Sequence, residues 1–381
     1  MKITFSSAAM LHHLGAASCA IGKKNSMPIL DCFLLEIADD GQAVNITASD
    51  GENVFITKAP LTAYAPDEDP TQTRICIGAK LLTDALKGMP DQPVTLTCNM
   101  KSKEVCGDYR GGYFAIMGVD AATYPVAPQL NADHQQLALP SALICSGIEH
   151  TLFATATDEI RLVMTGVLLD VVPDSVTFVG TDGKVLVRRT VHCHTGQECR
   201  IILPKKICNI LRSVLSTKES DTVAIAYDAQ RATFLSDQFS LTARLVEGRY
   251  PNYAGVVPQN PPAHATLSSS DLTQALRRIL NFADQGSGLV RFAFAQDGLT
   301  LHGHDLTYAT SGEELVSCEL FGKDEVEIGL NGFLCGEMIK NLGAAELTIL
   351  LTEPTHPVVF RPVDEEEDVD MLMLLMPMQL P

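Results

Sequence analysis

A pattern of two β-branched stretches joined by a turn that contains an aspartate occurs three times in this chain. The copies cover residues 44–55, 176–187 and 299–310. Glycine follows Asp50 and Asp182 and is absent after Asp305. Short β-branched runs joined by Asp-Gly predict β-hairpins. Because the three aspartates lie 132 and 123 residues apart, we expect one domain fold used three times.

One predicted helix precedes each hairpin and another follows it. The earlier helices cover residues 6–20, 139–154 and 267–283, and the later ones cover 79–88, 204–218 and 332–342. Serine stands at the start of each earlier helix, as expected of an N-cap. Strands are expected between helix and hairpin, at residues 28–37, 163–172 and 289–295. Each repeat then holds two helices and two small antiparallel sheets, which is an α+β module.

Proline and asparagine collect where the repeats meet, around residues 124–128 and 250–262. They predict three domains, at residues 1–128, 129–260 and 261–381. A chain of 381 residues is long enough for three ordinary cores.

Basic residues gather on the predicted helices although the chain is strongly acidic. The net charge is −18, which taken alone argues against a nucleic-acid partner. The helix windows are 6–19, 79–88, 141–154, 204–218, 270–284 and 333–342. They hold nine Lys and Arg and five Asp and Glu, a net charge of +4, so the rest of the chain carries −22. This segregation suits a protein that surrounds a polyanion, although ordinary solvated helix faces would give the same counts.

The cysteines predict a protein of a reducing compartment. Eleven Cys are scattered without zinc-type spacing, and several lie in apolar runs. We interpret them as reduced core thiols of a cytoplasmic protein. Neither a signal peptide nor a membrane span is expected.

The last forty residues hold two unusual runs. Residues 371–376 are apolar but short, and we interpret them as a buried edge strand. Residues 364–370 are acidic and are interpreted as a solvated hairpin loop, with a regulatory tail as the alternative.

Residue patterns for catalysis are weak, so we expect a protein without catalytic residues. His192-Cys193-His194 and His302-Gly303-His304 have the spacing of metal pairs on a strand, but no third ligand follows from the sequence. The position of Lys184 in Asp182-Gly183-Lys184 is occupied by Glu52 and Thr307 in the other two copies. This variation favours a role of the aspartate in the turn over a catalytic role. We expect neither a metal nor another cofactor.

Several motifs resemble those of the bacterial DNA sliding clamp family, the beta subunits of DNA polymerase III. They are NSMPIL at 25–30, TDGKVL at 181–186, LPKK at 203–206, LVEGRYPNY at 245–253, IGLN at 328–331 and MPMQL at 376–380. The segment 245–253 is the most specific of these. Together they span nearly the whole chain.

The resemblance implies a ring-forming clamp fold with three tandem repeats in each chain. Two chains would form a head-to-tail homodimer that encircles double-stranded DNA without sequence preference. The ring would tether a polymerase and so raise its effective concentration at the primer end. The implied partners are a clamp loader, the alpha subunit of DNA polymerase III, and other polymerases or repair proteins that carry clamp-binding peptides.

The resemblance also implies a pocket for a short, mostly apolar partner peptide. The matching positions are Met164, Thr181, Gly183, Lys184, Val185, Leu186, Pro251, Gly255, Val256, Asn331, Leu334, Leu374, Leu375, Met376, Pro377, Met378 and Leu380. Methionine-rich walls repack around varied peptides. Ordinary core positions would explain each Met or Leu taken alone.

The resemblance also implies residues that contact DNA and residues of the subunit interface. Lys24 and Arg161 match DNA-contacting loop residues of the family, and Lys205, Lys206, Arg212 and Arg277 are candidates on helices. Phe114 and Phe282 match apolar interface positions.

The chain departs from the family pattern at a few places. Gly255 replaces an arginine beside the pocket, Leu162-Val163 replaces aromatics, and Lys184-Val185 replaces His-Arg. The acidic loop is longer, and Pro381 extends the C-terminus. Two alternatives stay open: a clamp paralogue that holds peptides but loads poorly on DNA, and a metal hydrolase using the histidine strands.

Overall fold

The computed structural model describes residues 1–66, 72–218, 221–364 and 366–380. They form two compact units. Unit 1 contains Met1–Cys145 and Asn209–Leu245, and unit 2 contains Ser146–Cys208 and the chain from Val246 onward. Strands of the middle repeat therefore fall in both units, and the predicted domain boundaries stay a prediction.

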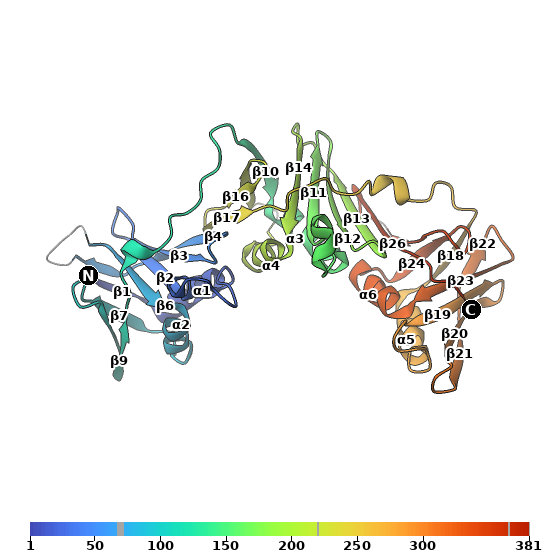
Figure 1. The fold of residues 1–381 in the computed structure, drawn as a ribbon, viewed down its shortest axis with the longest axis horizontal. Coiled ribbons are helices and arrows are strands. Elements are labelled where there is room, and N and C mark those ends of the chain that lie inside the picture. Colours follow the sequence, from blue (N-terminus) through green and yellow to red (C-terminus); the bar gives the residue numbers. More distant parts are fainter. Residues whose placement is uncertain (67–71, 219–220, 365, 381) are drawn as a thin grey trace. The chain divides into compact units, whose positions relative to one another are not determined.

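Within the described residues a strand runs directly into a helix six times, which confirms tandem α+β repeats (Figure 1). The pairs are β1 (Lys2–Ser6) with α1 (Ser7–Ser18), β6 (Arg74–Gly78) with α2 (Ala79–Lys87), β10 (Gln135–Pro140) with α3 (Ser141–Thr151), β14 (Cys199–Pro204) with α4 (Lys205–Val214), β18 (Ala263–Ser268) with α5 (Ser269–Ile279), and β23 (Glu325–Asn331) with α6 (Gly332–Leu342). Ser6 and Ser268 cap α1 and α5 with their hydroxyls, as predicted.

The three predicted hairpins are present and share one turn chemistry. They are β3 (Ala43–Ser49) with β4 (Val54–Pro60), β12 (Ser175–Thr181) with β13 (Val185–His192), and β20 (Gly298–Asp305) with β21 (Thr310–Val316). In each turn the aspartate Oδ1 accepts two backbone N–H groups, at 2.7–3.1 Å. Each repeated aspartate therefore stabilises a turn.

Two predicted strands begin later than expected. Residues 28–31 and 159–164 form 3-10 turns, and β2 (Cys32–Ile37) and β11 (Gly166–Val172) follow them. Pro28 fits the first position of such a turn, and the Asp158 carboxylate caps the other through the Ile160 N–H. The strand at Leu289–Ala295, β19, lies where it was predicted.

Strands of neighbouring repeats join into shared sheets, which is a feature that the sequence did not predict. The remaining strands are β5 (Ala63–Ala65), β7 (Pro93–Cys98), β8 (Glu104–Tyr109), β9 (Gly112–Met117), β15 (Thr222–Tyr227), β16 (Arg231–Leu235), β17 (Phe239–Arg244), β22 (Glu319–Phe321), β24 (Glu346–Leu351), β25 (Val358–Pro362) and β26 (Val369–Leu375). In the described ranges the sheet orders are β5-β1-β7-β8-β9, β10-β15-β16-β17-β4-β3-β2-β6, β14-β11-β12-β13-β26-β25-β24-β18-β22, and β21-β20-β19-β23.

Each unit contains one antiparallel join between repeats. In unit 1, β17 pairs with β4 from Phe239↔Thr57 to Thr242↔Val54. The rings of Phe55 and Phe239 stack across this join, with centroids 5.4 Å apart. In unit 2, β13 pairs with β26 from Val185↔Leu375 to Val191↔Val369. Residues 371–375 therefore lie in the interior of a sheet, and the predicted edge position of this segment is wrong.

Carboxylates of the acidic segment bind arginines across the β13–β26 join. Asp370 pairs with Arg188, and Glu366 accepts from Arg189 at 3.0 Å. The Asp368 carbonyl also accepts the His192 N–H at 2.7 Å. The Arg189 side chain is only 8% exposed, so the segment covers it and is more than a solvated loop. The alternative of a regulatory tail is untested, and residue 365 lies outside the described residues.

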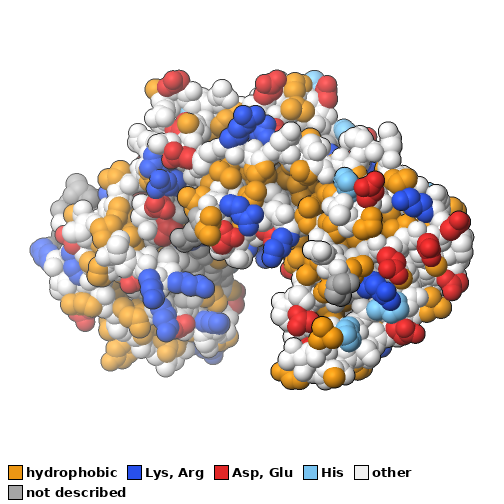
Figure 2. Space-filling view, turned by 45° about the vertical axis from the view of Figure 1, so that its right-hand side comes forward, with side chains coloured by type: hydrophobic (Ala, Val, Ile, Leu, Met, Phe, Trp, Pro, Cys, Tyr) orange, Lys and Arg blue, Asp and Glu red, His pale blue; other side chains and the backbone are white. Residues whose placement is uncertain are grey.

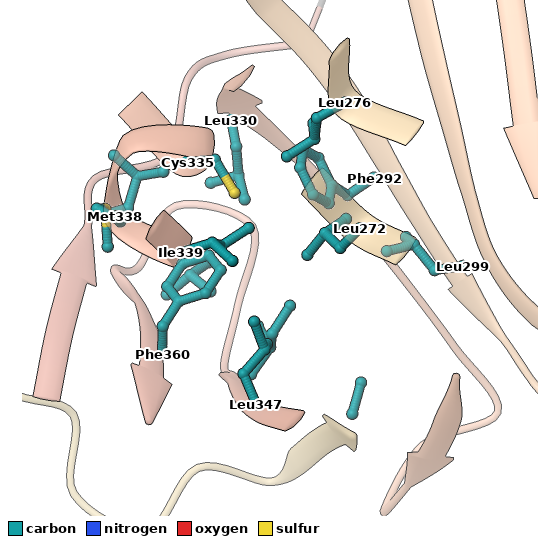
Figure 3. Packing of buried hydrophobic residues seen from close by; sticks show 14 of the residues in the cluster. Leu272, Leu276, Phe292, Leu299, Leu330, Cys335, Met338, Ile339, Leu347 and Phe360 are labelled. Carbon is teal, nitrogen blue, oxygen red and sulfur yellow. The ribbon is translucent and has the colours of Figure 1, made fainter. Parts of the chain in front are cut away.

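A large buried cluster in unit 2 lies between the third-repeat sheets and the helices α5 and α6. Figure 3 shows Leu272 and Leu276 of α5, Ile339 of α6 and Phe292 of β19 within it. These helices lie side by side in Figure 1. Most of their apolar side chains are buried while Arg277 and Lys340 are exposed, which is the pattern of an amphipathic helix pair.

The cysteines singled out in apolar runs are core residues. Cys32, Cys76, Cys98, Cys145 and Cys208 are buried. Burial raises the pKa of Cys76, Cys98 and Cys208 to about 12, so these thiols stay protonated at neutral pH. Across the described part of the chain, no helix has both the length and the apolar character to cross a membrane.

Replacing Glu366 by Gln together with Asp370 by Asn should destabilise unit 2. Arg188 and Arg189 would stay largely buried without their anionic partners. We expect a loss of about 1–2 kcal/mol in the free energy of unfolding, which calorimetry would register as a lower midpoint. The control is Glu367→Gln, because this exposed neighbour lies in the same segment. Equal midpoints for both variants and the parent would contradict a stabilising role of the two ion pairs.

Candidate functional site

Most predicted pocket residues meet at one end of the β13–β26 join. Val185 pairs with Leu375 and Leu186 pairs with Leu374, and all four are buried. The chain continues past β26, where the Met376 N–H donates to the Lys184 carbonyl at 2.8 Å. This hydrogen bond extends the pairing beyond β26 and places the 376–380 segment beside the Asp182 turn.

The linker that follows the middle repeat covers one face of this join. Tyr250 packs against Leu186 and Leu374 in a buried cluster, and its hydroxyl donates to the Val179 carbonyl at 3.2 Å. Burial and the nearby Asp170 carboxylate raise the pKa of Tyr253 to about 12, so this hydroxyl stays protonated and donates to Asp170 at 3.1 Å. Both tyrosines of the 245–253 motif therefore anchor this segment to the sheet.

The C-terminal segment is fixed against β23. Met378 and Gly329 form an isolated bridge, in which the Met378 N–H donates to the Gly329 carbonyl at 2.8 Å. A side chain at Gly329 would meet Leu380 Cδ2 at 3.0 Å and the Met378 carbonyl oxygen at 2.6 Å. Glycine at this position therefore lets the segment lie flat on the strand.

The predicted pocket has a buried floor and an accessible apolar rim. Met164, Pro251, Leu334, Pro377, Met378 and Leu380 are partly exposed, and Gly183, Lys184, Gly255, Val256 and Met376 are exposed. Val256 and Met376 keep 47% and 39% of their surface in contact with solvent. Apolar groups that remain accessible beside a fixed floor suit an apolar ligand.

Two of the predicted pocket residues stabilise local structure. The Thr181 hydroxyl donates to the Val185 carbonyl at 2.7 Å and accepts the Gly183 N–H. The Asn331 side chain caps α6 through the Leu334 N–H and donates to the Ser287 carbonyl. Both side chains hold the backbone around the pocket in place.

Arg161 lies beside the Asp182 turn, although the resemblance implied a DNA contact for it. Its guanidinium is 3.5 Å from the Asp158 carboxylate. Its Nη1 is 2.5 Å from where a Cβ at Gly183 would stand, so a side chain there would displace the end of Arg161, and the φ of 88° favours glycine. One DNA candidate therefore lies next to a pocket residue.

The helix pair α5–α6 forms a groove of about 880 Å³ that carries Arg277. Lys340 of α6 lines the same groove, a residue that the sequence placed on a helix but not in a site. Arg278, one residue further along α5, binds Glu314 of β21 through two of its nitrogens. Only one of the two adjacent arginines of α5 therefore lines the groove.

The remaining DNA candidates lie in both units. Lys24 is exposed in the segment after α1. Lys205 and Lys206 begin α4 and are half-buried, whereas Arg212 is exposed in its last turn.

The predicted interface residues lie at strands that end a sheet: Phe114 is on β9, and Phe282 is beside β21. Phe114 belongs to β9, where its ring lies over Gly107, which has no room for a side chain. Phe282 follows α5 and contacts Gly312 of β21. Tyr113 and Met117 on β9 are 72% and 67% exposed, which is unusual for large apolar side chains unless another chain covers them.

The histidine pairs do not form a metal centre in the described ranges. His194 contacts Asp174 at 3.1 Å, and His302 contacts Glu313 at 3.5 Å. No group of three potential ligands occurs there. This arrangement gives no support to the metal hydrolase.

Of the departures from the family pattern, Gly255 changes the pocket most directly. A Cβ at this position would stand 2.9 Å from the Asn252 amide nitrogen. Gln379, the exposed residue between Met378 and Leu380, lines a separate groove beyond Leu380 that the sequence did not predict.

Comparison with known proteins identifies the family. Models of the N-terminal, central and C-terminal domains of the DNA polymerase III beta subunit match residues 1–128, 138–252 and 254–379. A beta sliding clamp of Synechococcus elongatus is 28% identical over 373 residues, which are 96% of each chain. The beta sliding clamp of Escherichia coli is 23% identical over 387 residues, with full coverage of both chains.

Solved structures agree on the fold. The DNA polymerase III beta subunit of Pseudomonas aeruginosa superposes with a TM-score of 0.90 at 21% identity over all of both chains. A sliding clamp of the same organism bound to griselimycin gives a TM-score of 0.91, also over all of both chains. With family models matching almost every residue from 1 to 379, the chain belongs to the DNA polymerase III beta subunit family.

Proposed function

We propose that this chain is a DNA sliding clamp that encircles duplex DNA as a head-to-tail homodimeric ring and tethers polymerases. The observation that carries this proposal is the match of all three family models in order along the chain. The pairing of Leu186 with Leu374 and the Met376–Lys184 hydrogen bond support the proposal, because they bring predicted pocket residues from two repeats together.

The ring closes, in this proposal, by pairing β9 of one protomer with β21 of the other. Both strands end a sheet, and both carry exposed apolar residues, Tyr113 and Met117 on β9 and Leu315 on β21. Main-chain pairing of two such edges satisfies their free N–H and C=O groups and buries Phe114 and Phe282 nearby. Repeating this contact head to tail gives a closed dimer.

Helix-borne bases hold the DNA by contacting phosphates. Arg277, Arg212, Lys205 and Lys206 lie on α5 and α4, and Lys24 lies on a loop. Such contacts are independent of sequence and let the ring slide. The acidic remainder of the chain repels DNA from other surfaces.

Partners bind through a short peptide that fills the pocket at the end of the β13–β26 join. The alpha subunit of DNA polymerase III, other polymerases, repair proteins and a clamp loader are the proposed partners. The clamp itself supplies no catalytic residues and works in the cytoplasm. It contributes proximity, because a tethered polymerase rebinds its primer end before it diffuses away.

A paralogue that holds peptides but is poorly retained on DNA is the second candidate. The specific observation in its favour is Arg161, which pairs with Asp158 and lies beside Gly183 at the pocket. Loading separates the two candidates, since only a working clamp is retained on circular DNA after treatment with a clamp loader.

Lys24→Glu combined with Lys206→Glu should shorten the retention of the loaded protein on nicked circular DNA about tenfold, because each reversal replaces an attraction to phosphate by repulsion. Gel filtration of protein with labelled DNA measures the loss. Lys323→Glu is the control for a charge reversal at another site, since this exposed lysine lies in the turn before β23. Equal losses in both variants would mean that overall charge, rather than these positions, governs retention.

Met376→Asp should weaken a clamp-binding peptide at least about tenfold, because it removes apolar contact worth 1.4 kcal/mol or more. Fluorescence anisotropy with a labelled peptide from the DNA polymerase III alpha subunit measures the affinity. Val363→Asp is the control, because Val363 is equally exposed, at 40%, and lies outside the pocket. Unchanged affinity of the Met376 variant would place the peptide elsewhere.

A further inference from the structure

A second groove, of about 1170 Å³, lies on the outward face of the four-stranded sheet of unit 2. Its floor includes Arg291 of β19, His302 of β20, Glu313 of β21 and Glu327 of β23. Gln379 and Leu380 of the C-terminal segment form one border. None of the four floor residues belongs to the predicted pocket or to the predicted DNA and interface sites.

The strand pattern explains why charged side chains form this floor. Along β19, Val290, Phe292 and Phe294 are buried in the core, so Arg291 points the other way. The register places Arg291 opposite His302, and His302 opposite Glu313. Edge pairing of β21 with another chain uses main-chain groups and leaves its outward side chains over the groove.

The groove continues directly from the predicted peptide pocket. Leu380 belongs to both, and its side chain lies over Gly329, where Leu289 of the groove is also close. Met378, a pocket residue, is the next but one residue in the same segment. A chain that leaves the pocket across Leu380 therefore enters the groove.

The charge of the groove is negative. Asp284, Asp305, Glu313 and Glu327 line it, with Arg291 as its one guanidinium. Asp305 is occupied by its turn, and Glu327 lies 3.6 Å from Arg291. Burial and the neighbouring Arg291 lower the pKa of His302, so His302 is neutral at pH 7 and leaves the charge of Glu313 uncompensated. Figure 2 shows acidic, basic and histidine side chains intermingled on the right-hand part of the surface.

We propose that this groove binds a basic segment of a partner protein, next in sequence to the apolar peptide that occupies the pocket. The proposal rests on the proposed function, since the pocket must hold its peptide first. Carboxylates such as Glu313, which is 74% exposed at its side chain, would pair with Lys or Arg of the partner. Exposed pairs are individually weak and screened by salt, so the segment adds affinity to the peptide without replacing it.

Five labelled peptides test the proposal by fluorescence anisotropy at low and at physiological salt. The first is the clamp-binding peptide of the DNA polymerase III alpha subunit, and the other four carry four added lysines or four added glutamates at its N-terminal or its C-terminal end. At low salt, the peptide with lysines at one of its two ends should bind about fivefold tighter than the parent peptide. The glutamate peptide should bind no tighter than the parent.

Glu313→Gln with Glu327→Gln should abolish the gain from lysine and leave the affinity of the parent peptide unchanged. Glu319→Gln with Asp324→Asn is the matched control, because these exposed acids lie on or beside β22, outside the groove. A gain that survives in the groove variant, or that falls equally in the control, would overturn the proposal. No gain from lysine at either end would also overturn it. Failure of the parent peptide to bind would instead refute the pocket, and the groove with it.

Discussion

Main-chain pairing between strands of different repeats is the interaction on which the rest of this structure depends. A single repeat has short sheets with open edges, which are costly to leave unpaired. In unit 1 the edge of β17 is satisfied by β4, and in unit 2 that of β13 is satisfied by β26. Stacked phenylalanines support the first join, and two arginine–carboxylate pairs support the second. The acidic segment thus has a structural task that its composition alone does not reveal.

The same join creates the candidate site. Leu186 and Leu374 come from repeats that are far apart in sequence, yet they are paired residues on adjacent strands. The Asp182 turn ends one strand and the 376–380 segment continues the other, so both loops emerge on the same side. A buried floor with unbranched methionine side chains above it can accept apolar peptides of different shape. The carboxylates beyond Leu380 then allow discrimination by charge between partners whose apolar residues are alike.

Sequence reasoning predicted the elements well and their assembly less well. Serine caps, the repeated aspartate turns and apolar periodicity are local signals, and the helices and hairpins lie where those signals placed them. The pairing of β13 with β26 joins segments that are far apart in sequence. The residues of β26 alone do not show that β13 lies beside it, so the sequence predicts an edge strand there. The outward groove was also missed, because Arg291, His302 and Glu313 come together only through register. The predicted pocket residues came from the resemblance, since each Met or Leu among them would be an ordinary core residue when taken alone.

In the proposed function, DNA is held by being enclosed, with phosphate contacts that are individually weak. Topological linkage is the most direct test of this claim. The protein would be loaded onto a nicked circular DNA, the complex isolated, and the circle then cut once with a restriction enzyme. We expect the protein to stay on the circle for many minutes and to leave the cut molecule within seconds by sliding off its ends. Equal retention on circular and linear DNA would contradict enclosure and would mean that surface attraction alone holds the protein.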